Sequence, residues 1–221
     1  NVQIALFLLC TIPFWTSNVI RMISWIPFLG RNGIANQTLL DWGDQRIPHP
    51  SWTALTKLDC SVESAGMGKW LTRVRRRAPC PFPVRALYFG LGERATRDGV
   101  EFADLYFGLL SHYEPEDKAC EWLWRNPSHY PDKAYLGSAT LKAAGVICNE
   151  DEVTGLGTPG HMVFALAFAT LLLRASLDGR IHQLLGAVEP VGVVVGFDSG
   201  DLFRLGELHG HGFQPTVGAM T

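Results

Sequence analysis

Closely spaced cysteines are missing from this chain of 221 residues. Its five cysteines lie at positions 10, 60, 80, 120 and 148, and no two of them form a Cys-x-x-Cys pair. Structural zinc sites and the disulfide frameworks of small secreted domains both need cysteines at short, recurring spacings. The odd number and the wide spacing therefore argue against both kinds of site.

Nucleotide-binding and hydrolase motifs are missing as well. Gly90-Leu91-Gly92 lacks the third glycine of a dinucleotide-binding loop, and no phosphate loop or nucleophile-elbow motif occurs. His209 and His211 offer two imidazoles to a metal, but no third ligand accompanies them, and a solvent loop is the simpler interpretation. We therefore expect neither a cofactor nor a metal ion. The sequence also predicts a chain without internal repeats or low-complexity tracts.

A large charge of one sign is absent. Lys and Arg number 19 and Asp and Glu number 21, which gives a net charge of -2. This balance argues against a globally basic nucleic-acid binder, so we expect no nucleic-acid partner. Hydrophobic residues make up 47% of the chain and charged residues 18%, a composition too apolar for a disordered protein.

A long apolar run stands at the N-terminus. Residues 2–30 contain one charge, Arg21, and residues 2–20 contain none. That length matches the roughly 20 apolar residues of a transmembrane helix, although Pro13 interrupts it. The run has no basic leading segment, which disfavours a cleaved signal peptide, and a buried core helix is the alternative. We expect residues 1–40 to form an apolar membrane-type segment in contact with membrane lipid.

The middle of the chain, residues 41–85, is polar and rich in arginine and proline. Arginines cluster at positions 73, 75, 76 and 77, and prolines at 79, 81 and 83 favour an extended backbone. We see no sustained helical or strand period and predict an irregular linker. The basic cluster would then be a solvated charge run, with contact to lipid head groups or nucleic acid as the alternative.

Residues 86–221 are predicted to be a helical region. Between Val100 and Leu110 the apolar side chains recur at spacings of three and four, which is typical of a helix, so we predict helix across 86–126. Further helices are predicted over 116–124, 134–147 and 181–188, and Met162–Leu173 has the length of a buried core helix.

Two segments near the C-terminus depart from this helical pattern. Val191–Phe197 is rich in β-branched residues and indicates a strand or a buried helix end. The glycines between 206 and 218 indicate a loop-rich end. The predicted fold class is therefore mainly α, with an N-terminal membrane or buried apolar helical segment, an irregular middle and a helical C-terminal half.

The best candidate for acid–base chemistry joins Asp151, within Glu150-Asp151-Glu152, to His161. A carboxylate near an imidazole can orient it or shift its pKa, so the two would be catalytic residues. Because Pro159-Gly160 precedes the histidine, His161 would begin a helix whose N-terminal amides can bind an anion. The alternative is an acidic loop beside a surface histidine.

A motif in the N-terminal part points to a transporter family. Its segments are Pro13–Arg21, Trp25 and Leu29–Asn36, with an echo in Asp44–Pro48. These residues resemble the permease subunits of spermidine/putrescine-type ABC importers. The resemblance implies a fragmentary or chimeric permease subunit that transports polyamine-like solutes across the bacterial inner membrane. Its partners would be a cytoplasmic ATPase subunit and a solute-binding protein.

The C-terminal part is similar to a second family. The matching segments are His161–Ala169, Asp178–Arg180, Leu184–Glu189 and Gly212–Ala219. They resemble the helical domain of the MmgE/PrpD family, which includes 2-methylcitrate dehydratases and cis-aconitate decarboxylases. The alternative function is thus a cytoplasmic carbon-oxygen or carbon-carbon lyase that uses Asp151 and His161. The family's two histidines are replaced here, at Thr158 and Gln214, and glutamine cannot act as a general acid or base, so the resemblance implies an inactive lyase.

Overall fold

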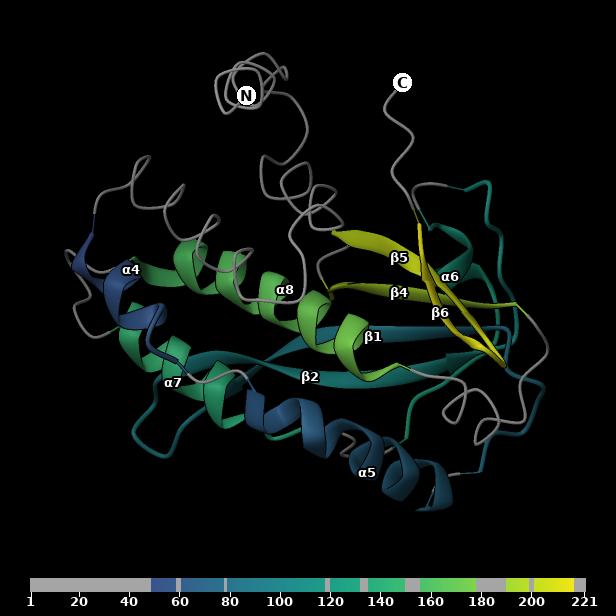
Figure 1. Cartoon of the computed structure of the whole chain (residues 1–221), viewed down its shortest axis with the longest axis horizontal. Helices are drawn as coiled ribbons and strands as arrows, with labels where there is room; N and C mark the ends of the chain where they lie inside the picture. The colour runs from purple at the N-terminus through teal and green to yellow at the C-terminus, as the bar shows by residue number, and fades with distance from the viewer. Residues whose placement is uncertain are drawn as a thin grey trace, which may run out of the picture.

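The computed structural model shows a six-stranded mixed sheet with helices packed along it (Figure 1). It describes residues 49–58, 61–77, 79–117, 120–131, 135–149, 156–177, 190–198 and 201–216. The spatial order of the strands is β3-β2-β1-β4-β5-β6. Their bounds are β1 Ala86–Ala95, β2 Glu101–Leu110, β3 Ser128–His129, β4 Val191–Phe197, β5 Leu202–His209 and β6 Gly212–Pro215. The described helices are α4 Pro50–Leu55, α5 Ser61–Arg77, α6 Trp122–Arg125, α7 Ala139–Cys148 and α8 Gly157–Ser176.

The centre of the sheet is a long hairpin extended by one parallel strand. β1 and β2 pair antiparallel, and their turn contains Gly99 at φ 83, a conformation that glycine adopts without strain. β4 pairs with β1 in parallel, in register from Ala86 opposite Gly192 to Leu91 opposite Phe197. A parallel pair requires a crossover connection, and the chain uses this connection to place α7 and α8 against the sheet.

The main hydrophobic core lies between the sheet and the helices α5, α7 and α8 (Figure 1). Alternate residues of the hairpin point into it, among them Phe89 and Phe107. α5 buries a stripe at spacings of three and four, made of Met67, Trp70, Leu71 and Val74. The indole of Trp70 meets the ring of Phe107 edge-on at 5.3 Å between centroids. We call this side of the sheet the helix face.

α8 is the longest of the described helices. Its segment Pro159–Ser176 is long and apolar enough to cross a membrane, but 61% of that segment is buried inside the fold. Phe164, Phe168 and Leu173 are among its core residues. The prediction of a buried core helix is therefore confirmed, with the helix beginning at Gly157, four residues before His161.

The predicted fold class, mainly α, is wrong. Residues 86–110 form the strands β1 and β2, and the predicted glycine-rich loop end forms β5 and β6. The sequence of the hairpin resembles that of a helix because both faces of the hairpin are largely buried. Apolar residues then occur on both sides of the strand, and the period-two alternation of a half-exposed strand disappears.

The prediction of an irregular linker over residues 41–85 is also wrong. α4 and α5 occupy Pro50–Leu55 and Ser61–Arg77, so the arginine cluster continues a helix. Lys69, Arg73 and Arg76 line a hollow on the outer side of α5, opposite its buried stripe. A helical, multi-span membrane permease is likewise contradicted: the described residues form a mixed α/β fold with a single long apolar helix, and that helix is mostly buried.

Other local predictions have mixed outcomes. Of the two alternatives for Val191–Phe197, the strand is correct and forms β4. The helices predicted over 116–124 and 134–147 are confirmed in part, because α6 covers only Trp122–Arg125 and α7 covers Ala139–Cys148. The apolar segment 1–40, the permease motif Pro13–Asn36, the helix predicted over 181–188 and the carboxylate of Asp151 lie outside the described residues. The membrane location and the importer partners therefore stay predictions.

Candidate binding site

The hairpin carries the same five residues twice. Leu-Tyr-Phe-Gly-Leu occupies 87–91 in β1 and 105–109 in β2, so the expectation of a chain without internal repeats is wrong. Antiparallel pairing sets Tyr88 opposite Gly108 and Gly90 opposite Tyr106, with Phe89 and Phe107 between them. Each tyrosine thus lies across from a glycine, on the side of the sheet away from the helix face. We call this side the tyrosine face.

Glycine is required at these positions because aromatic rings occupy the space of a side chain. A Cβ atom at Gly90 would lie 2.3 Å from the ring of Tyr106, and one at Gly108 would lie 2.4 Å from the ring of Tyr130. Both distances are far shorter than a van der Waals contact. The glycines therefore allow the rings to lie directly on the backbone of the sheet.

The rings of Tyr106, Trp124 and Tyr130 line a cavity of about 350 Å³, which we call the aromatic pocket, and each of these rings packs against the ring of Tyr88. Tyr88 is fully buried, and three rings meet it at steep angles. Its centroid lies 5.9 Å from Tyr106 at 86°, 6.1 Å from Trp124 at 72° and 6.5 Å from Tyr130 at 90°. Leu123, Ser128 and Asp198 complete the lining.

Asp198 supplies the carboxylate of the aromatic pocket. It follows β4 directly, and β4 lies beside β1, which brings the carboxylate to the tyrosines. The hydroxyl of Tyr88 donates to Asp198 Oδ1 at 3.3 Å, and the hydroxyl of Tyr106 donates to the same oxygen. One oxygen thus accepts two phenols while the aspartate side chain remains exposed to solvent.

The phenols of the aromatic pocket are held in their protonated form. Burial raises the pKa of both Tyr88 and Tyr106 well above the ordinary value, and the neighbouring carboxylate of Asp198 raises it further. Burial also raises the pKa of Tyr130, although a hydrogen bond with Ser128 opposes the shift. At neutral pH the pocket therefore combines neutral aromatic rings with the charge of one carboxylate.

The segment that crosses the tyrosine face positions the outer wall of the pocket. Trp122 and Leu123 of α6 are buried in a second hydrophobic cluster with Tyr88 and Tyr113. The ring of Tyr113 packs edge-on against Trp122 at 5.6 Å. Because these side chains anchor α6, the next residue, Trp124, points outward and is 53% exposed.

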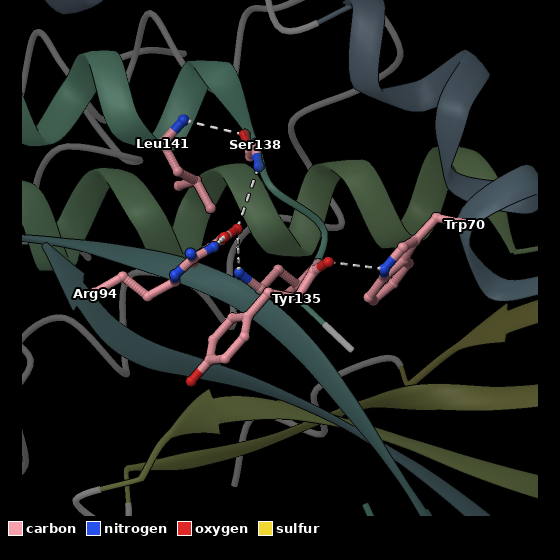
Figure 2. A network of polar contacts seen from close by, with 7 residues as sticks. Trp70, Arg94, Tyr135, Ser138 and Leu141 are labelled. Atoms are coloured by element: carbon pink, nitrogen blue, oxygen red, sulfur yellow. Dashed lines mark hydrogen bonds and ion pairs between the residues drawn. The ribbon is translucent and has the colours of Figure 1, made fainter. Parts of the chain in front are cut away.

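A buried aspartate and its partners support the neighbouring wall (Figure 2). Asp104, fully buried, pairs with Arg94 at 2.9 Å and accepts the backbone N–H groups of Leu105 and Ser138 at 2.9 and 3.2 Å. Figure 2 shows the hydroxyl of Ser138 turned toward the backbone N–H of Leu141, from which it accepts a hydrogen bond. The guanidinium of Arg94 also lies 5.0 Å from the ring centre of Tyr135, which packs against Tyr106 at 5.6 Å. The fold itself thus contains a cation resting on an aromatic ring.

His161 occupies a structural position on the helix face. It is 5% exposed, and its Nε2 accepts the backbone N–H of Ala103 in β2 at 3.3 Å. Burial lowers its pKa, and a hydrogen bond with the backbone of Leu141 only partly opposes this shift. The alternative of a surface histidine is therefore wrong. Because Asp151 lies outside the described residues, its pairing with His161 and the lyase function stay predictions.

His209 and His211 stack at 5.1 Å at the tip of the β5–β6 hairpin. Gln214 lies 3.1 Å from the Nε2 of His211. Within the described ranges, no three side chains of the metal-ligating types come close enough to hold a metal ion. This hairpin is therefore a weaker candidate site than the aromatic pocket.

Sequence reasoning missed every residue of the aromatic pocket. Tyr106, Trp124 and Tyr130 come from three places along the chain, and Asp198 lies 92 residues beyond Tyr106. The repeated Leu-Tyr-Phe-Gly-Leu was the available signal, since it pairs a tyrosine with a glycine in each strand. The chain matches no protein-family model, no curated protein and no solved structure.

Proposed function

We propose that the protein is a binding protein whose aromatic pocket holds the positively charged head group of a small organic molecule. The observation that supports this proposal is the placement of one carboxylate, that of Asp198, in a pocket lined by three aromatic side chains. The faces of tyrosine and tryptophan rings attract cations through their quadrupoles, and Asp198 adds a full opposite charge.

The dimensions and the exposure of the pocket agree with this role. Its volume of about 350 Å³ is at the small end of ligand cavities, which suits a head group with a few carbon atoms. Trp124 and Tyr130 are among the large apolar side chains that the fold leaves exposed, at 53% and 39%. Exposed aromatic side chains at a concave site are typical of ligand binding.

The proposal is tested by calorimetric titration of the full chain with choline and with 3,3-dimethylbutan-1-ol. The two molecules have the same shape, and only choline is charged. We expect choline to bind more tightly, because cation–π attraction contributes about 0.5–2 kcal/mol in such sites. Equal binding of the two, or binding of neither, would overturn the proposal.

A matched pair of variants assigns the effect to the pocket. Asp198→Asn removes the charge with little change in shape, and we expect it to weaken choline binding by about tenfold, since opposite charges about 4 Å apart attract by about 1–4 kcal/mol near a protein surface. Glu114→Gln removes an exposed carboxylate that pairs with His112 outside the pocket. This control should leave choline binding unchanged.

A further inference from the structure

The carboxylate of the aromatic pocket is occupied on one side only. Oδ1 of Asp198 accepts the hydroxyls of both Tyr88 and Tyr106. Among the described residues, no group donates a hydrogen bond to the second oxygen, Oδ2. Because a carboxylate oxygen has two lone pairs, Oδ2 is available to N–H groups of a ligand.

Two hydroxyl groups add acceptors to the same lining. Ser128 and Tyr130 both line the pocket, and their side chains are hydrogen-bonded to each other. That bond uses one lone pair, whereas each hydroxyl oxygen carries two. Both oxygens can therefore still accept a hydrogen bond. The pocket thus combines three oxygen acceptors with three aromatic side chains.

The exposure of the lining decides which interaction contributes more to binding. Asp198, Ser128, Trp124 and Tyr130 are all exposed. At exposed sites an aromatic ring strengthens the binding of a cation by about two- to fivefold, whereas a hydrogen bond that involves a charged group contributes about tenfold or more. An open site also lets a bound ammonium group keep part of its hydration. A cation with N–H donors therefore gains more in this pocket than a cation without them.

We propose that the aromatic pocket selects primary ammonium groups over quaternary, methylated ones. A primary ammonium has three N–H donors for the oxygens of Asp198, Ser128 and Tyr130, and the rings attract its charge. A trimethylammonium has the same charge, but it places methyl groups against these oxygens, which then lose water without gaining a hydrogen bond. The inference rests on the proposed function, because it names the class of cation that the same site takes.

The test compares choline with ethanolamine, which has the same chain and carries a primary ammonium in place of the trimethylammonium. Calorimetric titration of the full chain should show tighter binding of ethanolamine, by about tenfold. Choline that binds as tightly as ethanolamine, or more tightly, would overturn the selectivity and leave cation binding intact. Choline that binds no better than its neutral analogue overturns the proposed function itself.

A variant that removes one acceptor assigns the preference to the lining. Ser128→Ala removes an exposed hydroxyl and leaves the rings and the carboxylate in place. Ethanolamine should then bind more weakly, by about threefold or more, while choline binds as before because it donates no N–H group. Thr56→Ala is the matched control, since its exposed hydroxyl donates to the carbonyl of Thr53 outside the pocket. Equal losses for the two ligands in Ser128→Ala, or none, would contradict the inference.

Discussion

The two faces of the central hairpin differ sharply, although the same pair of strands forms both. On the helix face, Phe89 and Phe107 pack into a continuous hydrophobic core beneath α5, α7 and α8. On the tyrosine face, tyrosines alternate with glycines, and the rings surround a cavity that opens to solvent. Successive side chains of a strand point to opposite faces. In each repeat of Tyr-Phe-Gly the phenylalanine therefore lies on the helix face, and the tyrosine and the glycine lie on the tyrosine face.

The contrast between the faces predicts a large difference in stability between two truncations. Phe107→Ala removes a buried ring that contacts Trp70 and Phe89, and we expect it to lower the free energy of unfolding by about 3–5 kcal/mol. Tyr130→Ala removes a ring that is 39% exposed, and the loss should be clearly smaller. Urea denaturation measures both.

Ligand binding should respond in the opposite order. Under conditions in which both variants are folded, Tyr130→Ala should weaken choline binding and Phe107→Ala should largely retain it. Equal losses of stability in the two variants, or a loss of choline binding only in Phe107→Ala, would contradict this comparison. Stability would then not depend mainly on the helix face, or binding would not depend mainly on the tyrosine face.

A second comparison concerns glycines on the sheet and on a helix. At Gly90 an added Cβ would lie 2.3 Å from the ring of Tyr106, so Gly90→Ala must displace that ring at a cost of about 1–3 kcal/mol and weaken ligand binding. At Gly68, inside α5, a Cβ has no neighbour within 4 Å. Gly68→Ala should therefore raise the free energy of unfolding by about 0.5–1 kcal/mol. Thermal and urea unfolding of the two variants measure whether the free energy of unfolding falls in Gly90→Ala and rises in Gly68→Ala.

The last predicted effect is the pH dependence of stability that comes from His161 on the helix face. Its pKa is lowered in the folded state, so between the folded pKa and the unfolded value of 6.5 the unfolded chain binds the additional proton. Stability from this group is present above pH 6.5 and is lost as the pH falls, by at most about 1.4 kcal/mol per pH unit. On the tyrosine face the raised pKa values of Tyr88 and Tyr106 act in the opposite direction, and cost stability only above pH 10.0.

The measurement for His161 is urea unfolding at several pH values in the native chain, in His161→Gln and in His112→Gln. His112 lies on the surface and pairs with Glu114. His161→Gln should flatten the acid side of the stability profile, and His112→Gln should leave it unchanged. The same acid slope in His161→Gln as in the native chain would show that another group titrates.

Parts of the fold were predictable because their sequence signal is local. β4 consists largely of β-branched residues, and α8 has the length and the apolar content of a core helix. β1 and β2 were not predictable by periodicity, because burial on both faces removes the alternation on which a strand prediction depends. α5 was missed because its arginines and the glycines Gly66 and Gly68 mask its buried stripe.

The aromatic pocket was not predictable from spacing along the chain. Tyr106 and Asp198 meet only because β4 inserts beside β1, and Trp124 reaches the pocket only because α6 is anchored by Trp122. His161 is a catalytic candidate in the sequence because the acidic segment Glu150-Asp151-Glu152 precedes it. The fold uses it instead as an acceptor for a backbone amide.

The edge of β2 has a consequence for how the protein meets other copies of itself. Three backbone groups along this edge already have partners. The N–H of Ala103 donates to His161, and the carbonyl of Leu105 accepts the N–H of Leu136. The carbonyl of Glu101 accepts the side-chain amide of Asn149. A strand whose backbone groups are occupied offers no template to an incoming strand. Strand addition along this part of β2 would first require α7, α8 and the residue Leu136 to move away from this edge. We therefore expect His161 and Asn149 to hinder polymerisation, because they occupy backbone groups that an incoming strand would need.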